Sequence, residues 1–545
     1  MVGDVSSAAD ASTPPAPRPP NIVFILADDL GWADAGFAGS RFYETPNLDA
    51  LANSGIRFTS FYMSQNCAPS RAAIFSGQYA PRTGVYTVGS LERGEAAARK
   101  MAVPTNQTSL PERTTTVSSL LKAAGYATGI FGKWHLGFDA TNHPKARGFD
   151  EYLLAADKHF GFVTDPPTEV AATNYLADFL TDKAVDFIQR HKARPFFLHL
   201  AHFGVHAPHQ AKQELIARFE KKPPSGGHRD AVYAAMIASI DESVGRVLAQ
   251  IDTLGLSSNT LVVFASDNGG VGGYTDPESN GRRIGVTDNA PLRGGKGMLY
   301  EGGLRVPFLA RWPGVIGPAT KTIQPALHVD LFPTFCDVAG IQSPTNHVLD
   351  GMSLLPVLKN PVAPLGRDAI FWHFPGYLEA YGKPGWRTTP VGAIRAGNFK
   401  LLEFFEDGRA ELYNVIEDLG EKNNLVQSLP EKAKELRHKL AVWRRELGAA
   451  MPTLLPPRPP PASFPAAKPG AAPAESKPTP APPPAATPPN PAPANPTPAP
   501  TPAPAVTNAP AATPPSAPPG TNAPAAPAPA PAPAPAPPAS APKSS

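Results

Sequence analysis

The sequence predicts an α/β protein with a large, mostly parallel sheet flanked by helices, a smaller C-terminal α+β subdomain and a disordered tail rich in proline and alanine. Up to about residue 320, short apolar runs alternate with helical patterns, as in a doubly wound sheet. Beyond that point the strand-like pieces are shorter. Of the 69 prolines, 37 lie in residues 452–545, a composition that prevents a packed core.

These patterns divide the chain into four parts. Residues 1–20 are predicted to be a disordered leader, 21–320 the main domain, 321–451 the smaller subdomain and 452–545 the disordered tail. The alternation of alanine and proline favours polyproline II in the tail, which suits a spacer or surface tether. A biased segment without a specific role remains the alternative.

Five apolar runs of strand length form the predicted core of the sheet, at residues 22–26, 128–131, 196–200, 261–265 and 306–310. In the smaller subdomain, strands are predicted at residues 391–394 and 400–404, followed by a helix at 430–447.

Two helices of the main domain are predicted from their spacing and their ends. Apolar residues recur every three or four positions from Val232 to Ile251, with Gly255 just beyond, which favours an amphipathic helix. Another helix is expected to begin at Pro46, with Thr45 as its N-cap, and to end before Gly55.

Composition excludes several classes of protein. The formal charge of +3 resides in the tail, so the balanced body argues against a nucleic-acid binder. Two cysteines cannot form a disulfide framework, and no apolar run approaches the roughly 18 residues of a membrane helix. The N-terminus lacks the pattern of a signal peptide, so we expect either a cytosolic protein or an export signal that was removed.

Polar clusters directly follow two of the predicted strands, where ligands gather in open α/β sheets. Asp28 and Asp29 follow the first strand, and Asp267 and Asn268 follow the fourth. Their oxygens form a set that suits Ca²⁺ or Mg²⁺. Taken alone, each pair could equally be a solvated loop or a tight turn.

The two cysteines have different surroundings. Cys67 begins the segment Cys-Ala-Pro-Ser-Arg, and Pro69 suits a first helical turn. Cys67 would then lie at a helix N-terminus, where negative charge is favoured. Cys336, between Phe335 and Val338, has the pattern of a buried apolar residue.

The segment from Cys67 to Arg71, followed by an apolar run and a glycine, resembles the signature of the formylglycine-dependent sulfatases of the alkaline phosphatase-like superfamily. Other segments resemble this family in order and spacing: NIVFILADD from Asn21, GKWHLG from Gly132, HAP from His206, SDNG from Ser266 and GKG from Gly295. The resemblance covers about residues 21–450 and is closest to the arylsulfatase and N-acetylgalactosamine-6-sulfatase branch.

The resemblance implies a sulfatase catalytic domain at residues 21–320 that removes sulfate from a sulfated hexose or N-acetylhexosamine of a polysaccharide or glycosaminoglycan. In this family a formylglycine-generating enzyme oxidises the cysteine to an aldehyde, whose hydrate attacks sulfur. The family pattern makes one Ca²⁺ a second cofactor, with these ligands: Asp28, Asp29, Asp267, Asn268 and the modified Cys67.

The resemblance also assigns roles to the catalytic positions. Arg71 would hold the nucleophile, and Lys133 would neutralise a sulfate oxygen. His135 would be the base that expels sulfate, while Lys296 and His206 would hold the sulfate and protonate the leaving oxygen.

Substrate contacts are expected from residues with weaker patterns. His159 resembles a further position of the sulfate site. His373, Tyr377, Trp386 and Arg387 are candidates for contacts with the sugar, although loop residues without that role are as good an interpretation.

Two other functions fit the same residues. One is a phosphoesterase or phosphonate ester hydrolase of the same superfamily, but Lys133 and Lys296 favour a single metal and a sulfate. The other is a relic that binds sulfated glycans without cleaving them. Polymeric substrates lie outside the cell, which favours a periplasmic or extracellular location, with neither nucleic acid nor a membrane span involved.

Overall fold

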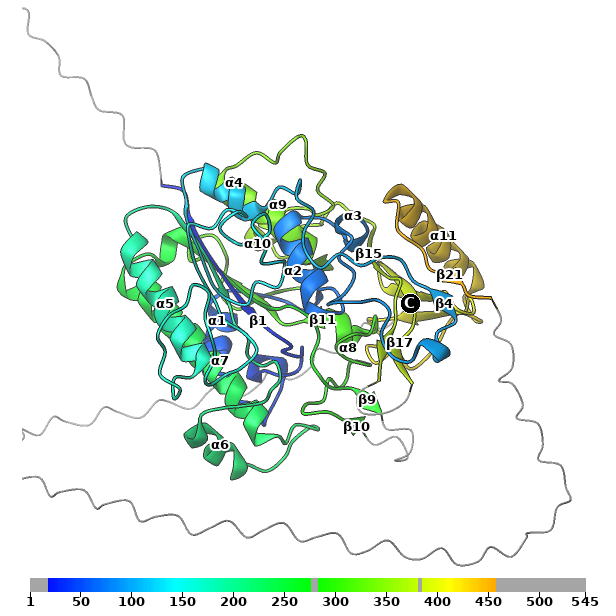
Figure 1. Ribbon diagram of the computed structural model, residues 1–545, viewed down its shortest axis with the longest axis horizontal. Coiled ribbons are helices and arrows are strands. Elements are labelled where there is room, and N and C mark those ends of the chain that lie inside the picture. The colour runs from blue at the N-terminus through cyan, green and yellow to red at the C-terminus, as the bar shows by residue number, and fades with distance from the viewer. Residues whose placement is uncertain (1–17, 276–282, 381–384, 457–545) are drawn as a thin grey trace, which may run out of the picture. The chain divides into compact units, whose positions relative to one another are not determined.

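A central sheet of eight strands organises the protein, of which the computed structural model describes residues 18–275, 283–380 and 385–456 (Figure 1). The strands run in this order: β13 (Thr320–Thr322), β2 (Ile56–Phe58), β12 (Phe308–Arg311), β8 (Thr260–Ser266), β1 (Asn21–Ala27), β7 (Phe196–Ala201), β5 (Ala127–Gly132) and β6 (Glu151–Leu154). All neighbours pair in parallel except β12, which is antiparallel to β2 and β8. The predicted mostly parallel sheet is confirmed.

Four of the five predicted core strands are confirmed as β1, β5, β7 and β8. The fifth, at residues 306–310, is confirmed in the central sheet from Phe308 onward, but it is divided at Pro307 because proline has no backbone N–H to donate to a ladder. The chain forms β11 (Arg305–Val306), which pairs with β3 (Phe61–Tyr62) in a separate sheet, and then β12 in the central sheet.

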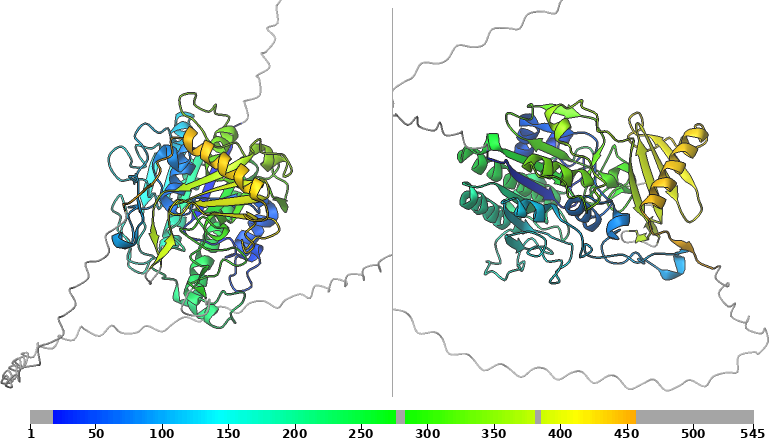
Figure 2. Two further views of the ribbon diagram at one scale, coloured as in Figure 1. Left: turned by 90° about the vertical axis from the view of Figure 1, so that its right-hand side faces the viewer. Right: turned by 90° about the horizontal axis from the view of Figure 1, so that it is seen from above.

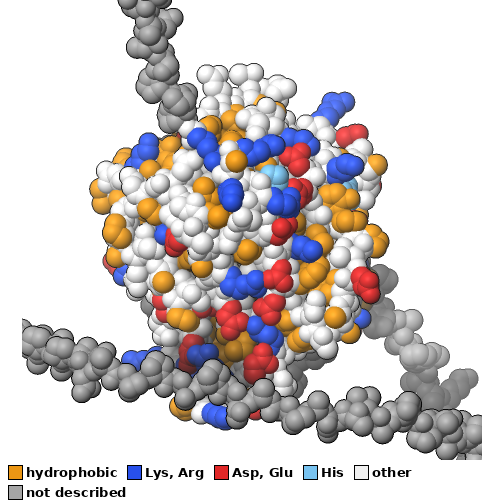
Figure 3. Space-filling model, turned by 90° about the vertical axis from the view of Figure 1, so that its left-hand side faces the viewer, with side chains coloured by type: hydrophobic (Ala, Val, Ile, Leu, Met, Phe, Trp, Pro, Cys, Tyr) orange, Lys and Arg blue, Asp and Glu red, His pale blue; other side chains and the backbone are white. Residues whose placement is uncertain are grey.

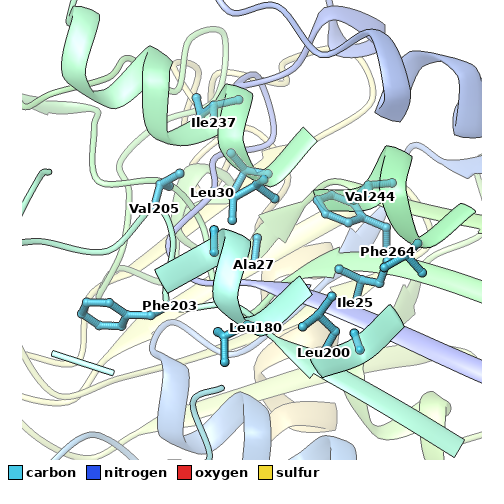
Figure 4. Close-up of a cluster of buried hydrophobic side chains, with 14 of the residues drawn as sticks. Ile25, Ala27, Leu30, Leu180, Leu200, Phe203, Val205, Ile237, Val244 and Phe264 are labelled. Atoms are coloured by element: carbon cyan, nitrogen blue, oxygen red, sulfur yellow. The ribbon is translucent and has the colours of Figure 1, made fainter. Parts of the chain in front are cut away.

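Helices cover both faces of the central sheet. One face packs against α1 (Pro46–Ser54), α5 (Leu176–His191), α6 (Gln213–Glu220) and α7 (Ala231–Thr253). The other packs against α2 (Cys67–Ser76), α4 (Val117–Ala123), α9 (Leu331–Ala339) and α10 (Leu355–Lys359). Strand β1 is fully buried because alternate residues face the two cores, Ile25 and Ala27 on one side (Figure 4) and Phe24 on the other.

The two predicted helices of the main domain are present, with one difference at an end. The side chain of Asp230 caps α7 by accepting a hydrogen bond from the N–H of Tyr233 at 2.8 Å. Helix α1 begins at Pro46 with Thr45 in the N-cap position, as expected, but the side chain of Thr45 makes no capping hydrogen bond. The carboxylate of Asp241, on α7, accepts from the N–H groups of Asn47 and Leu48 at 3.1 and 2.8 Å.

The smaller subdomain contains an antiparallel sheet in the order β15 (Ala369–Phe374), β18 (Val391–Ala396), β19 (Phe399–Phe404) and β20 (Ala410–Asn414). Helix α11 (Pro430–Glu446) lies across this sheet (Figure 2), so the predicted strands and helix are confirmed. Helices α9 and α10 follow the predicted boundary at residue 320, yet they pack on the central sheet.

Short elements complete the described chain: α3 (Ala80–Thr83), α8 (Glu301–Leu304), β4 (Met101–Ala102), β9 (Tyr274–Thr275), β10 (Arg283–Ile284), β14 (Ala326–Leu327), β16 (Leu378–Glu379), β17 (Trp386–Thr388) and β21 (Thr453–Leu454). Strand β21 pairs with β4 although we expected residues 452–454 to belong to the tail. Residues 457–545 and most of the predicted leader lie outside the described residues.

The surface agrees with the balanced charge of the body. On the face shown in Figure 3, basic and acidic side chains are intermixed. No helix within the described ranges combines the length and the hydropathy that crossing a membrane requires.

Candidate active site

The polar clusters meet at one edge of the central sheet, as the sequence predicts. Asp28 and Asp29 directly follow β1, Lys133 follows β5, and Asp267 follows β8. These three strands carry their carboxyl ends at the same edge because they run parallel. Cys67 is the first residue of α2, so the predicted helix N-terminus is confirmed.

Unusual backbone conformations direct the chain into this site. Gly132 ends β5 with φ at +116°, and a Cβ there would lie 1.9 Å from the carbonyl oxygen of Ala201. This close approach lets the N–H of Lys133 donate to the same carbonyl at 2.8 Å. Asp29 and His135 also have positive φ values, 66° and 65°, which cost free energy in residues other than glycine.

Cys67, Asp28 and Asp267 form a buried group whose sulfur and carboxylate oxygen atoms lie within 4.8 Å of one another. Arg71 donates to Oδ2 of Asp267 from Nε at 3.0 Å and from Nη2 at 2.8 Å. Its Nη1 donates to the carbonyl oxygen of Lys133 at 2.6 Å. The ammonium group of Lys133 in turn pairs with Oδ2 of Asp28.

Asp29 forms the adjacent part of the site. The ammonium group of Lys296 lies 2.8 Å from both of its carboxylate oxygens. Nδ2 of Asn268 donates to Oδ1 at 2.8 Å, and Nε2 of His206 lies 3.7 Å from Oδ2. The predicted metal ligands and the two predicted lysines therefore form one connected cluster.

The two buried carboxylates beside Cys67 have opposite pKa shifts. Burial alone would raise the pKa of Asp28, but the charges of Lys133, His206 and Arg71 hold it well below its usual range. Burial and the nearby Asp28 raise the pKa of Asp267 to about 6. Burial also raises the pKa of the Cys67 thiol, although Lys133 and Lys296 act in the other direction.

The cluster fits a hard cation. Oδ1 of Asp28 and Oδ1 of Asn268 are both buried, and neither has a hydrogen-bond partner among the described residues. Buried polar atoms without partners are costly, and a cation would satisfy both oxygens. Carboxylate and amide oxygens are the ligands that Ca²⁺ prefers, so these residues fit the expected metal.

His135 is poised as a neutral imidazole. Burial, followed by the charges of Lys133 and Arg71, lowers its pKa to about 3. Its Nδ1 is buried and has no hydrogen-bond partner within the described part of the chain. His135 is therefore unprotonated near neutral pH.

These groups open into a cavity of about 690 Å³. Six of the predicted site residues line it: Asp29, Cys67, Lys133, His135, His206 and Lys296. Arg387, one of the sugar-binding candidates, also lines the cavity, and its Nη1 donates to the carbonyl oxygen of Lys296 at 3.1 Å. Trp386 is not among the lining residues and packs on Tyr377 with ring centroids 4.7 Å apart.

His159 does not line the cavity, so it is not placed for the direct sulfate contact that we expected. It is buried behind His206, and its Nε2 donates to the carbonyl oxygen of His206 at 2.8 Å. Its ring stacks on Phe203, with centroids 4.9 Å apart. Burial lowers the pKa of His159 to about 4, which leaves it a neutral support for the His206 backbone.

His373 and Tyr377 also lie away from the cavity, contrary to the expected sugar contacts. Nε2 of His373 donates to the carbonyl oxygen of Ala450 at 2.9 Å, within the smaller subdomain. The hydroxyl of Tyr377 donates to Oε1 of Glu406 at 2.7 Å. Both side chains are buried, because β15 and the segment before β16 direct them into the packing of this subdomain.

The cavity wall contains residues that the sequence did not single out, among them Arg93, Phe138, Val163, Asp165 and Glu379. They lie on loops and a short strand that no motif marks. They are recognised as site residues only because the folded chain brings them to the same cavity.

Two family models match this chain. The model described as Sulfatase matches residues 20–341, which include the whole cluster around Cys67. The model described as N-sulphoglucosamine sulphohydrolase, C-terminal, matches residues 295–446.

Individual proteins are similar over most of the described residues. A sulfatase of Formosa agariphila is 33% identical over 507 residues, covering 78% of this chain and 89% of that protein. The N-acetylgalactosamine-6-sulfatase of Mus musculus is 36% identical over 370 residues, covering 63% and 67%. The crystal structure of Ps i-CgsB, also determined in complex with k-i-k-neocarrahexaose, has a TM-score of 0.66 and 31% identity, covering 78% of this chain and 93% of that one.

Proposed function

Since this chain belongs to the sulfatase family and is a sulfuric ester hydrolase, we propose that it removes sulfate from a sulfated sugar, with formylglycine made from Cys67 and one Ca²⁺. The observation that carries this proposal is the place of Cys67 at the start of α2, in one buried group with Asp28 and Asp267. The sugar is supported by the printed names of two similar proteins, N-acetylgalactosamine-6-sulfatase and the neocarrahexaose complex of Ps i-CgsB.

Four side chains and Cys67 would hold the metal: Asp28, Asp29, Asp267 and Asn268. Their unpartnered oxygens, on Asp28 and Asn268, support this assignment. Bound Ca²⁺ would offset the repulsion between the buried carboxylates and stabilise negative charge on the sulfate. Formylglycine supplies an aldehyde whose hydrate offers one hydroxyl to attack sulfur and another to release the sulfate.

The chain's own residues bind the sulfate and move protons. Lys133 and Lys296 bring two ammonium groups to the cavity wall beside Cys67, where they neutralise sulfate oxygens. His135, which lines the cavity two residues beyond Lys133, is the base that helps to expel sulfate. His206, which is partly exposed to the cavity, donates a proton to the leaving sugar oxygen.

Maturation and location follow from the same proposal. Conversion of Cys67 requires a formylglycine-generating enzyme as a partner before the fold buries the thiol. A polymeric sulfated substrate lies outside the cell, which favours a periplasmic or extracellular site of action.

The proposal is tested by assaying the full-length protein, produced with the converting enzyme, on 6-sulfated N-acetylgalactosamine and on its 6-phosphate. We expect hydrolysis of the sulfate ester, loss of activity in a chelator and recovery with Ca²⁺. Cys67→Ala should lower the rate by roughly 10⁴-fold or more while the melting temperature stays unchanged. Preference for the phosphate ester, or full activity of Cys67→Ala, would refute the proposal.

A further inference from the structure

Two exposed apolar side chains line the mouth of the cavity. Phe138 and Val163 keep 65% and 83% of their surface accessible, and both are lining residues. The described residues leave nine large hydrophobic side chains exposed, and the other seven lie elsewhere. Single exposed apolar residues are ordinary, but apolar surface gathered at the mouth of a cavity indicates a binding site.

The topology brings these two residues together. Phe138 lies three residues beyond His135 in the loop that follows β5, and Val163 lies in the loop that follows β6. Strands β5 and β6 pair in parallel, so both loops leave the same edge of the sheet. The apolar lip, defined as Phe138 and Val163, therefore continues the wall that begins at Lys133 and His135.

Charged groups line the same cavity from other elements. Nη2 of Arg93 lies 3.1 Å from Oε1 of Glu379, on β16, and both side chains are partly exposed. Oε2 of Glu379 is buried and has no hydrogen-bond partner among the described residues. Thr164 and Asp165, next to Val163, add further polar groups.

The apolar lip and the Arg93–Glu379 pair together indicate which class of ligand fits this part of the cavity. A sugar ring has apolar C–H faces and hydroxyl groups at its edge, so it can contact the lip and hydrogen-bond to the charged pair together. A steroid would place hydrocarbon against the Arg93–Glu379 ion pair and remove water from its charged groups, which costs free energy.

We infer that the apolar lip and the Arg93–Glu379 pair form a subsite for a second sugar ring, joined to the ring that carries the sulfate. The inference rests on the proposed function for the position of the sulfated ring, next to Cys67, Lys133 and Lys296. It identifies the substrate as an oligosaccharide rather than a sulfated monosaccharide or a steroid sulfate.

Binding to the inactive full-length Cys67→Ala protein tests this subsite without any turnover. Three probes are titrated by calorimetry with Ca²⁺ present: 6-sulfated N-acetylgalactosamine, a disaccharide that carries this ring at its non-reducing end, and a steroid sulfate. We expect the disaccharide to bind more tightly than the other two. Adding Phe138→Ala should weaken disaccharide binding roughly 10- to 100-fold and leave the monosaccharide unchanged.

Control variants separate the subsite from general effects. Val362→Ala removes a side chain that is 79% exposed and lies away from the cavity. This variant should bind the disaccharide and the monosaccharide with unchanged affinity. Phe138→Tyr keeps the aromatic face and should retain disaccharide binding. Glu379→Gln should weaken only the disaccharide.

Equal affinity for disaccharide and monosaccharide would overturn the subsite, as would an equal loss of both in Phe138→Ala. Tighter binding of the steroid sulfate that depends on Phe138 would overturn the sugar assignment. These outcomes are distinct from failure of the proposed function, which appears as absence of sulfate release by the mature Cys67 protein.

Discussion

Arg71 connects the helix that carries Cys67 to the carboxylate of Asp267. Nε and Nη2 of Arg71 both donate to Oδ2 of Asp267, at 3.0 and 2.8 Å, and neither side chain is exposed. The interaction joins α2 to the loop after β8, so it sets the position of Cys67 relative to the expected metal ligands. Arg71 is thus placed to position Cys67, the nucleophile of the proposed function.

Arg71→Lys should lower kcat/KM about 10- to 100-fold, because one ammonium group cannot replace a planar group that also donates to the Lys133 carbonyl. Arg82→Lys is the matched control, since Nε of Arg82 donates to both oxygens of Asp350, at 2.9 and 3.0 Å, away from the cavity. Steady-state kinetics compare the two variants. Equal kcat/KM values for both would refute the positioning role.

Gly132→Ala should destabilise the fold and reduce activity together, because its Cβ would collide with the carbonyl of Ala201 beside Lys133. Gly39→Ala is the control: φ at Gly39 is +108°, yet a Cβ there would meet nothing within 4 Å. Backbone strain alone costs about 1–3 kcal/mol, so we expect urea unfolding to show a larger loss for Gly132→Ala. An equal loss of unfolding free energy in Gly132→Ala and Gly39→Ala would contradict the steric explanation.

The pH dependence of stability should contain a contribution from Glu421, which is buried with Glu301 around the ammonium group of Lys400. Burial, opposed by Lys400 and reinforced by Glu301, raises the pKa of Glu421 from 4.5 to about 7. Between these values the folded protein holds a proton that the unfolded chain has released. The free energy of unfolding should therefore fall by about 3 kcal/mol as pH rises from about 4.5 to 7.

Glu421→Gln should remove this slope, which denaturant unfolding at pH 5 and pH 8 would measure. Glu301→Gln is the contrasting variant, because burial is outweighed by Lys400 and Arg305 and the pKa of Glu301 is lowered to about 2. Its charge stabilises the fold above about pH 4.5, and this stabilisation is lost as pH falls towards 2, so Glu301→Gln should destabilise at both pH values. A slope unchanged in Glu421→Gln would contradict the assignment.

Deletion of residues 457–545 should leave kcat/KM and the melting temperature unchanged, since the site and the packed cores lie within the described residues. Deletion from residue 452 also removes β21 and the hydrogen bond from the N–H of Leu455 to the carbonyl of Lys100, at 2.9 Å. We expect that deletion to cost about 1–2 kcal/mol. Calorimetry of both truncated proteins tests where the folded part of the chain ends. Equal melting temperatures would show that β21 does not stabilise the fold and that the folded part ends before it.

Local patterns predicted the parts of the fold that local physics determines. Strands β1, β5, β7 and β8 are continuous apolar runs because helices cover both faces of the parallel sheet. The core of the site was predictable because Asp28 and Asp267 directly follow two of these strands. Pro307 was visible too, but the strand prediction did not account for its missing N–H.

Long-range contacts account for the remaining differences. The carboxylate that caps α1 belongs to Asp241, which is far from α1 in the sequence. The residues next to the helix offered only Thr45 as a candidate cap. His373 and Tyr377 face into the smaller subdomain, a direction that depends on packing around α11 and β4. The rim of the cavity comes from loops that meet only in the folded protein, which is why Phe138 and Glu379 had no signal in the sequence.

The central claim is that Cys67 becomes formylglycine, and the mass of one peptide tests it most directly. Trypsin should release residues 58–71, between Arg57 and Arg71, from protein made with the converting enzyme and shown to hydrolyse a sulfate ester. We predict an aldehyde in place of the thiol at Cys67. An unmodified cysteine in that active protein would contradict the proposed mechanism.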